Sequence, residues 1–318
     1  MLQLALPLGL MGWMAFAPQR TRFGFWIQFI AAAAALWAIA LLGIWLLPPW
    51  WAPYAFGAAL AAAAGVGLWR HQTFALAWPA TWGAGGVMFF SVALSAGSAY
   101  GIAVALRSRT LPPEHAVNLA FPLEAGVYLV VNGGSDLNTN AHLMTLDASI
   151  PRFQEWRGQS YGVDIVKLDA LGLRARGVLP TDPKAYRIYG ARVIAPCAGR
   201  VVLAVDGLPD MPVPEVDRAH LAGNHVMLRC VEAIGNVNFN ADVLLGHLRP
   251  GSVQVREGAN VAVGDWLGSV GNSGNTGEPH LHVHAQRPGP AAAPLGGDPL
   301  PILFDGRHPV RGDRIESR

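Results

Sequence analysis

Hydrophobic residues dominate the first third of the chain in long runs, and they alternate with polar residues in short runs after that. Three runs, Phe23–Leu47, Ala52–Trp69 and Ala84–Leu106, have about the length of a helix that crosses a bilayer, roughly 20 residues. Residues 2–17 are a fourth candidate, and their flanks lack the basic start and small-residue cleavage site of a secretory signal. The pattern predicts a membrane anchor of three or four α-helical spans within residues 1–110.

From about residue 118 the apolar runs become short and are bounded by Gly, Pro or Asn, which is typical of strands. No segment in this part keeps a helical period over three turns. We therefore predict a linker at 111–117, then an all-β domain at 118–318 built on an antiparallel sheet. Residues 207–223, rich in proline and charge, predict a long insertion loop. The runs expected as strands are Gly126–Val131, Gly162–Val166, Ala191–Ile194, Arg200–Val205, His225–Leu228 and Val243–Leu245.

Charge divides the chain at the same place. The 318 residues carry 44 formal charges, yet residues 1–110 contain only five of them, all arginines. The same 110 residues contain nine of the 11 tryptophans. Tryptophan favours the membrane–water interface, so this composition supports an anchor in a lipid bilayer. The rest of the chain is slightly acidic, and without a basic patch nothing indicates nucleic-acid binding.

Arginines near the spans also predict orientation, because positive loops favour the cytoplasmic side. Arg20, Arg22 and Arg70 place their loops in the cytoplasm, whereas Arg107 and Arg109 favour the opposite orientation. The majority predicts that the residues after 106 lie on the extracytoplasmic side, periplasmic or extracellular, of a multi-pass protein. On that side Cys197 and Cys230 could form a disulfide, and two free buried thiols are the alternative.

Candidate chemistry is concentrated in Gly271–Gln286, which reads GNSGNTGEPHLHVHAQ. On a strand, alternate residues share a face, so His280, His282 and His284 are expected on one side. Imidazole is the commonest protein ligand for zinc, and a catalytic zinc site uses three protein ligands and an open position. Three alternating histidines after a Gly/Asn-rich turn therefore indicate a metal site, which still needs a carboxylate and a further histidine.

These residues resemble a known family. Gly271–Val283 is similar to the G-N-S/T-G-x-S/T-x-x-P-H-L-H-F/V signature of the lysostaphin-type (LytM-like) zinc metallopeptidases. Tyr189–Val202, Gly223–Leu228 and Gly246–Leu248 resemble its other segments in the same order. The resemblance covers roughly residues 125–305 and implies a peptidase domain of duplicated-hybrid-motif type with one zinc ion.

Carried over by position, the resemblance implies that His282 and Asp164 are zinc ligands. It implies that His280 is a catalytic histidine, and that His247 is a second one that orients the water or stabilises the oxyanion. His284 is expected to do no more than contact a ligand.

The chain departs from the family where the remaining ligand is expected. The common form is H-x-x-x-D, but the residue four before Asp164 is Ser160. Some members supply this histidine from an upstream N-x-H segment, and Asn140-Ala-His142 resembles that variant. We therefore expect the ligand set His142, Asp164 and His282.

Together with this resemblance, the sequence predicts a membrane-anchored zinc metalloendopeptidase, a hydrolase. The resemblance implies that it acts on peptidoglycan cross-links or stem peptides of the bacterial cell wall. The alternative, motivated by Ser160, is a catalytically degenerate relative that acts as a cell-wall binding or activator module.

Overall fold

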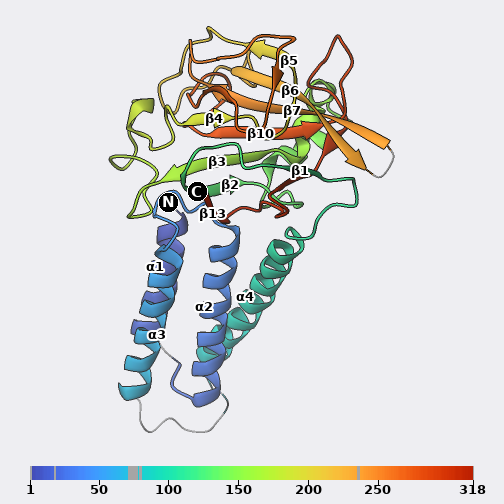
Figure 1. Cartoon of the computed structure of the whole chain (residues 1–318). Coiled ribbons are helices and arrows are strands. Elements are labelled where there is room, and N and C mark those ends of the chain that lie inside the picture. Colours follow the sequence, from blue (N-terminus) through green and yellow to red (C-terminus); the bar gives the residue numbers. More distant parts are fainter. Residues whose placement is uncertain (1, 18, 71–77, 79–80, 235–236, 318) are drawn as a thin grey trace. The chain divides into compact units, whose positions relative to one another are not determined.

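The computed structural model describes residues 2–17, 19–70, 78, 81–234 and 237–317. The chain forms two compact units, a helical one at Met1–Arg107 and a β-rich one at Ser108–Arg318. Figure 1 shows the helices of the first unit side by side in a bundle and the strands of the second unit side by side in a sheet. This is the predicted class, apolar helices followed by a β-rich domain with an antiparallel sheet.

The helical unit contains α1 (Leu2–Phe16), α2 (Arg22–Leu42), α3 (Ala52–Arg70) and α4 (Trp82–Arg107). By length and composition, three of the described helices, α2, α3 and α4, could cross a membrane. Helix α1, with 15 residues, is shorter than a typical span. Large apolar side chains lie on the outside of the bundle, as expected of helices that are hydrophobic all round.

The second helix is shorter than the run Phe23–Leu47 predicts. It ends at Leu42, and the N–H of Gly43 donates to the carbonyl of Ile39. Residues 44–51 continue as turns through two prolines, which cannot extend the helix.

Gln28 is a fully buried polar side chain of the helical unit. The Gln28 amide donates to the carbonyls of Trp13 and Ala17, at distances of 3.4 and 3.2 Å, and accepts from the N–H of Gln19. Backbone groups at a helix end need partners where water is absent. Gln28 thus joins the end of α1 to α2.

The β-rich unit is built on a nine-stranded sheet with the order β13-β2-β3-β10-β7-β6-β5-β8, and β11 pairs with β10. All strand pairs in this sheet are antiparallel. Strands β4 and β9 form a separate antiparallel pair, and β1 lies parallel to β12. The strands of the described residues are β1 (Val117–Leu119), β2 (Gly126–Asn132), β3 (Val163–Leu168), β4 (Arg192–Ile194), β5 (Gly199–Val205), β6 (Asn224–Ile234), β7 (Val237–Leu248), β8 (Asn260–Val261), β9 (Trp266–Ser269), β10 (Leu281–Gln286), β11 (Pro299–Leu300), β12 (Ile302–Phe304) and β13 (Arg314–Ser317).

Strand β10 separates the hydrophobic core from the polar face of the sheet. Its six residues are all buried. Leu281, Val283 and Ala285 belong to the core cluster, while His282 and His284 alternate with them and therefore face the other way. The alternation brings histidines to a buried but polar surface.

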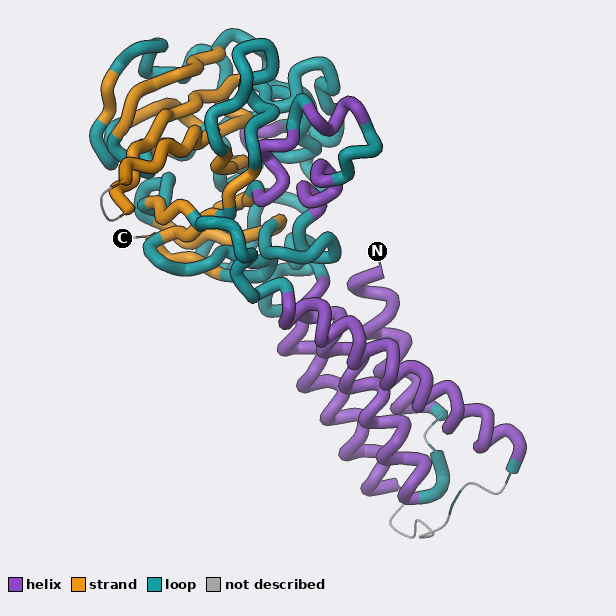
Figure 2. The backbone as a smooth tube through the Cα atoms, turned by 90° about the vertical axis from the view of Figure 1, so that its right-hand side faces the viewer, coloured by secondary structure: helices purple, strands orange, loops and turns teal. Residues whose placement is uncertain are grey.

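Short helical segments lie beside this surface. They are η1 (Ala141–Leu146), α5 (Pro151–Gln154) and η2 (Arg157–Tyr161), and η2 packs against β10. Figure 2 shows these segments in purple, gathered beside the orange strands. A further short turn, η3, covers Pro183–Ala185.

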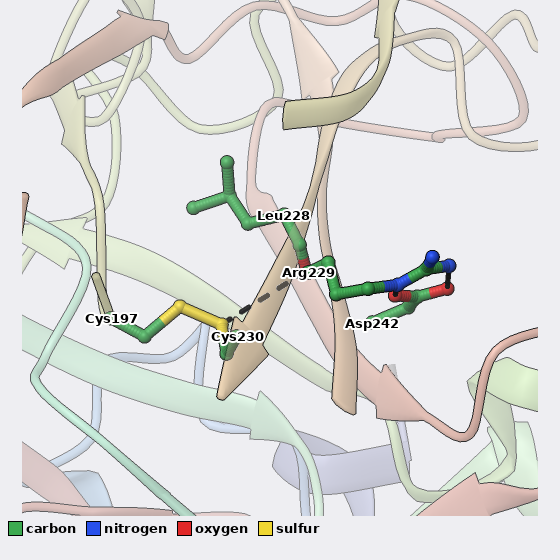
Figure 3. Close-up of a disulfide and its surroundings, with 5 residues drawn as sticks. All are labelled: Cys197, Leu228, Arg229, Cys230 and Asp242. Carbon is green, nitrogen blue, oxygen red and sulfur yellow. Dashed lines mark hydrogen bonds and ion pairs between the residues drawn. A yellow bond between two sulfur atoms is a disulfide. The ribbon is translucent and has the colours of Figure 1, made fainter. Parts of the chain in front are cut away.

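The two cysteines form a disulfide, which was one of the two alternatives that the sequence allowed. Cys197 and Cys230 have their Cα atoms 5.9 Å apart, and the bond joins the β4–β5 loop to β6 (Figure 3). Next to it, the Arg229 guanidinium donates to both oxygens of Asp242 at 2.8 and 2.9 Å.

Candidate metal centre and catalytic histidines

Asp164 and His282 face each other across two neighbouring strands. The antiparallel register of β3 and β10 pairs His282 directly with Asp164, so both side chains leave the sheet on the same face. The distance from His282 Nδ1 to Asp164 Oδ1 is 2.9 Å. The backbone ladder alone therefore fixes the carboxylate beside the imidazole.

His142 reaches the same place from a short helical segment. It lies in η1, where the Asn140 side chain caps the helix by accepting from the His142 N–H. His142 Nδ1 lies 3.0 Å from Asn140 Oδ1 and 3.1 Å from Asn132 Nδ2, so two asparagine side chains hold the ring. His142 Nε2 lies 3.6 Å from Asp164 Oδ2.

These three side chains have the donor set of a zinc site. One ligand atom from each of His142, Asp164 and His282 lies within 4.8 Å of the others. Two imidazoles and one carboxylate leave one position of a tetrahedral zinc for water or substrate. The structure thus brings together the residues expected as ligands, and they fit the metal that the family resemblance implies.

Gly162 allows two of these rings to approach each other. A Cβ atom at this position would lie 2.7 Å from His282 Cε1 and 3.3 Å from His142 Nδ1. The His142 and His282 ring centroids are 4.8 Å apart. Any larger residue here would force one of the rings to move.

Asn132, at the end of β2, is a site residue that the sequence analysis missed. Its amide nitrogen lies 3.2 Å from Asp164 Oδ2, and its amide oxygen accepts from the N–H of Ala141 at the start of η1. Arg311 donates to the same oxygen at 3.3 Å and to the carbonyl of Val131. In the sequence, Asn132 precedes two glycines and resembles an ordinary turn residue, so no local signal identified it.

Ser160 lies outside the ligand set and supports it. Its hydroxyl is buried, donates to the carbonyl of Arg157 and lies 2.8 Å from the Thr145 hydroxyl. Thr145 in turn lies 2.8 Å from the carbonyl of His142. The residue found where the family commonly has a ligand therefore holds η1 against η2.

His280 and His247 lie beside the ligands. His280 Nε2 is 3.4 Å from Asp164 Oδ1, and the His280 and His247 ring centroids are 4.7 Å apart. Each Nδ1 lies 2.9 Å from a backbone carbonyl, that of Glu278 for His280 and that of Ser273 for His247. These contacts place the proton on Nδ1 and leave Nε2 as the basic atom of each ring.

His247 holds an uncommon backbone conformation. Its φ is 61°, in the left-handed region that side chains other than glycine rarely adopt. Its N–H donates to the carbonyl of Ala222 at 2.9 Å, which helps to hold this conformation. Strain of this kind is typically found at functional sites.

Burial and mutual contacts set the protonation of the cluster. Burial lowers the pKa of His142 to about 4, although the Asp164 carboxylate opposes this shift. Burial alone would raise the pKa of Asp164, but the surrounding histidines hold it well below its usual range. Burial and neighbouring imidazoles also hold the pKa of His247 well below its usual range. An ionised carboxylate and neutral imidazoles are the forms that bind metal.

The pKa of His280 shifts in the opposite direction. Burial acts to lower its pKa, but the charge of Asp164 and a hydrogen bond to it dominate, and the pKa of His280 is raised. His280 thus holds a proton more readily than His142, His247 and His284, whose pKa values are lowered.

His284 contacts a candidate ligand, as its position on β10 suggested. Its Nδ1 is 2.9 Å from His282 Nε2, the ring nitrogen that faces away from Asp164. Burial and the neighbouring His282 hold the pKa of His284 well below its usual range. A neutral His284 therefore fixes the orientation of the His282 ring.

A cavity of about 550 Å³ opens at these residues. Its lining includes all five predicted site residues, and apolar walls come from Met144, Phe153, Trp156, Leu221 and Leu295. Arg152 and Arg218 also line it. The site is thus large enough to hold a segment of a peptide.

The predicted insertion loop, residues 207–223, is bonded to the turn that precedes β10. Asp210 Oδ1 accepts from the N–H of Asn272, and Asn272 Nδ2 donates to the carbonyl of Met211. The N–H of Asp217 donates to the carbonyl of Gly274. Insertion and turn together form one wall of the cavity.

Comparison with known proteins agrees with this fold and site. Residues 185–294, within the β-rich unit, match the model of Peptidase family M23. The match includes His247, His280 and His282, while His142 and Asp164 lie upstream of it. No curated protein matches the sequence.

Solved structures of the same type are distant in sequence. The catalytic domain of lysostaphin from Staphylococcus simulans is 20% identical, with 42% of this chain and 71% of that domain covered and a TM-score of 0.26. A peptidase M23 from Pseudomonas aeruginosa is 16% identical, with 59% and 54% covered and a TM-score of 0.27. A zinc-containing peptidase from Vibrio cholerae is 18% identical, with 39% and 46% covered and a TM-score of 0.23. The chain thus spans about half the length of the last two.

Proposed function

We propose that this protein is a membrane-anchored zinc metalloendopeptidase that hydrolyses peptide bonds in peptidoglycan, in cross-links or stem peptides. The observation that carries the proposal is the convergence of His142, Asp164 and His282 on one point, with two further histidines beside it at a cavity. Such a set provides metal ligands and proton carriers together. The match to a peptidase family supports the same reaction class.

The ligands would hold one zinc ion, which supplies a Lewis acid for the scissile carbonyl and a bound water with a pKa near 7. His280, whose pKa is raised by Asp164, accepts the proton of the attacking water at Nε2. His247 keeps its proton on Nδ1 through the Ser273 carbonyl, so its Nε2 is a neutral hydrogen-bond acceptor that helps to orient the water. The fixed tautomers require no reorganisation during the reaction.

We also propose that the apolar helices span the membrane and that the β-rich unit lies on the extracytoplasmic side. Helices α2, α3 and α4 have the length and composition of spans. The Cys197–Cys230 disulfide supports the orientation, because disulfides persist in oxidising compartments. Peptidoglycan is found on that side, so the anchor would keep the enzyme at its substrate.

The test uses the full chain in detergent, with zinc measured by plasma mass spectrometry and cleavage by release of peptides from purified peptidoglycan. We expect about one zinc per chain and zinc-dependent cleavage. His280→Ala should keep the zinc and lose cleavage, whereas His282→Ala should lose both. His115→Ala is the control, because His115 is exposed in the segment before β1.

The degenerate alternative predicts a different result. A binding or activator module would retain the cell wall in a pull-down assay and show neither zinc nor cleavage. Full cleavage by His282→Ala would also contradict the proposed enzyme.

A further inference from the structure

We infer that Arg152 and Arg218 bind substrate carboxylates, so that the peptide taken by this cavity is acidic rather than uncharged. The inference rests on the proposed peptidase function and names the substrate class for that site. It follows from the charge of the cavity lining, from the absence of a carboxylate partner for either guanidinium group among the described residues, and from the apolar side chains that line the same cavity.

The lining of the cavity is strongly unbalanced in charge. Among its described residues, Asp164 is the one carboxylate, and its oxygens face the metal ligands and His280. The two other charged side chains are Arg152, in α5, and Arg218, in the insertion loop. A divalent ion on the ligands would add further positive charge. The cavity therefore attracts anionic groups, and its concave shape strengthens the attraction.

Neither guanidinium is neutralised within the described part of the chain. Arg152 lies over the Phe153 ring at 5.2 Å and is in no salt bridge there, and Arg218 is likewise in none. Both side chains are exposed.

Neighbouring arginines differ, because they have carboxylate partners. Arg157 lies 3.7 Å from Asp298, and Arg174 lies 2.9 Å from Glu278. Arg152 and Arg218 thus keep their planar sets of N–H donors for a ligand, and carboxylates match that geometry.

Apolar side chains line the same cavity as the two arginines. Phe153, Trp156 and Leu295 contribute on the side of α5, and Leu221 contributes from the insertion. A glycine chain would leave these surfaces without a partner, since glycine has no side chain to bury. A peptide with aliphatic side chains that end in carboxylates, or with a free α-carboxylate, meets both the apolar walls and the guanidinium groups.

The experiment compares two forms of one cross-linked stem peptide, one with free carboxylates and one with every carboxylate amidated. The full chain in detergent should cleave the acidic form with a kcat/KM about ten-fold higher, the usual size of a pair of charge-assisted contacts at an exposed site. In R152Q/R218Q this ratio should fall to about one through loss of activity on the acidic form alone. The control R256Q should keep the ratio, because Arg256 is exposed outside the cavity lining.

Equal cleavage of both peptides by the native chain would overturn the inference. The same holds if R152Q/R218Q slows both peptides to the same extent, because that result indicates a structural role. If the native chain cleaves neither peptide, the proposed function fails separately. Binding of the two peptides to the His280→Ala variant, followed by calorimetry, then decides the inference: preference for the acidic form supports it, and equal affinity refutes it.

Discussion

The proposed metal centre has two halves that are positioned by different means. Asp164 and His282 lie on paired strands, and the register of β3 and β10 places them opposite each other. His142 lies on the six-residue segment η1, which is held by side-chain hydrogen bonds from Asn140, Asn132 and Thr145. A strand pair positions its residues through many backbone bonds, whereas a short segment depends on a few contacts. The η1 half should therefore be the more sensitive to mutation of its surroundings.

The largest effect is expected from removing a ligand in either half. His142→Ala and His282→Ala should each abolish stoichiometric zinc and lower peptide cleavage by about 1,000-fold or more, since a two-ligand site holds catalytic zinc poorly. Zinc content and kcat/KM of the full chain measure this. Near-native zinc and activity in His142→Ala would show that the η1 half does not belong to the centre.

A smaller effect is expected from Asn132→Ala, which leaves all ligands in place. This change removes the amide that contacts Asp164 and the start of η1, and should weaken zinc affinity by about 10- to 100-fold. Competition with a chelator measures the affinity. Asn138→Ala is the control, because the side chain of Asn138 is exposed and bonds Asp136. Equal affinities for the two variants would contradict a positioning role of Asn132.

The protonation of His142, in the η1 half, makes the stability of the fold depend on pH. His142 has a pKa of about 4 in the folded chain and near 6.5 in the unfolded chain. Between these two pH values the folded chain keeps His142 neutral, whereas the unfolded chain binds a proton there. Stability is therefore lost as the pH falls through this window. The free energy of unfolding of the metal-free chain should drop by roughly 1 to 2 kcal/mol between pH 6.5 and 5 through His142 alone.

Urea titrations at both pH values measure this change, and His142→Gln should reduce the slope. The lowered pKa of His247 acts in the same direction. His280, with its raised pKa, contributes stability that is present below pH 6.5 and is lost at higher pH. A native slope unchanged in His142→Gln would refute the assigned protonation of His142.

The smallest effect is expected from Ser160→Ala. The change removes the hydroxyl contact to Thr145 and should lower the free energy of unfolding by about 1 kcal/mol, with zinc still bound. Ser149→Ala, at an exposed hydroxyl that bonds Asp147, is the matched control. Complete loss of zinc in Ser160→Ala would mean that Ser160 acts as more than a support.

The strand-borne half is also the half with the clearer sequence signal. The alternation in Leu281–Gln286 predicts that one face is apolar and the other carries histidines, and the structure has this arrangement. Periodicity is a local property, so one segment is enough to show it. The change from long apolar runs to short strand-like runs likewise predicted helices followed by a β-rich domain.

What the sequence could not supply depends on distant contacts. Nothing near Asn132 indicates that Arg311, far along the chain, donates to its side chain. Likewise, Arg152 and Arg218 are isolated charges in the sequence and share a cavity only after folding. The register that pairs Asp164 with His282 also needs the whole sheet, because a slip by one residue would turn either side chain to the other face.

The bonds between the insertion and the turn before β10 make these segments a single cooperative unit. Asn272 is joined to Met211, and the N–H of His247 is bonded to Ala222 at the end of the insertion. In hydrogen-exchange terms, their amides should open together, with one free energy of local unfolding. A ligand held by Arg218 would then slow exchange at Asn272 and His247 as well. Substrate binding at the rim would in this way stabilise the backbone that carries His247, a proposed catalytic histidine.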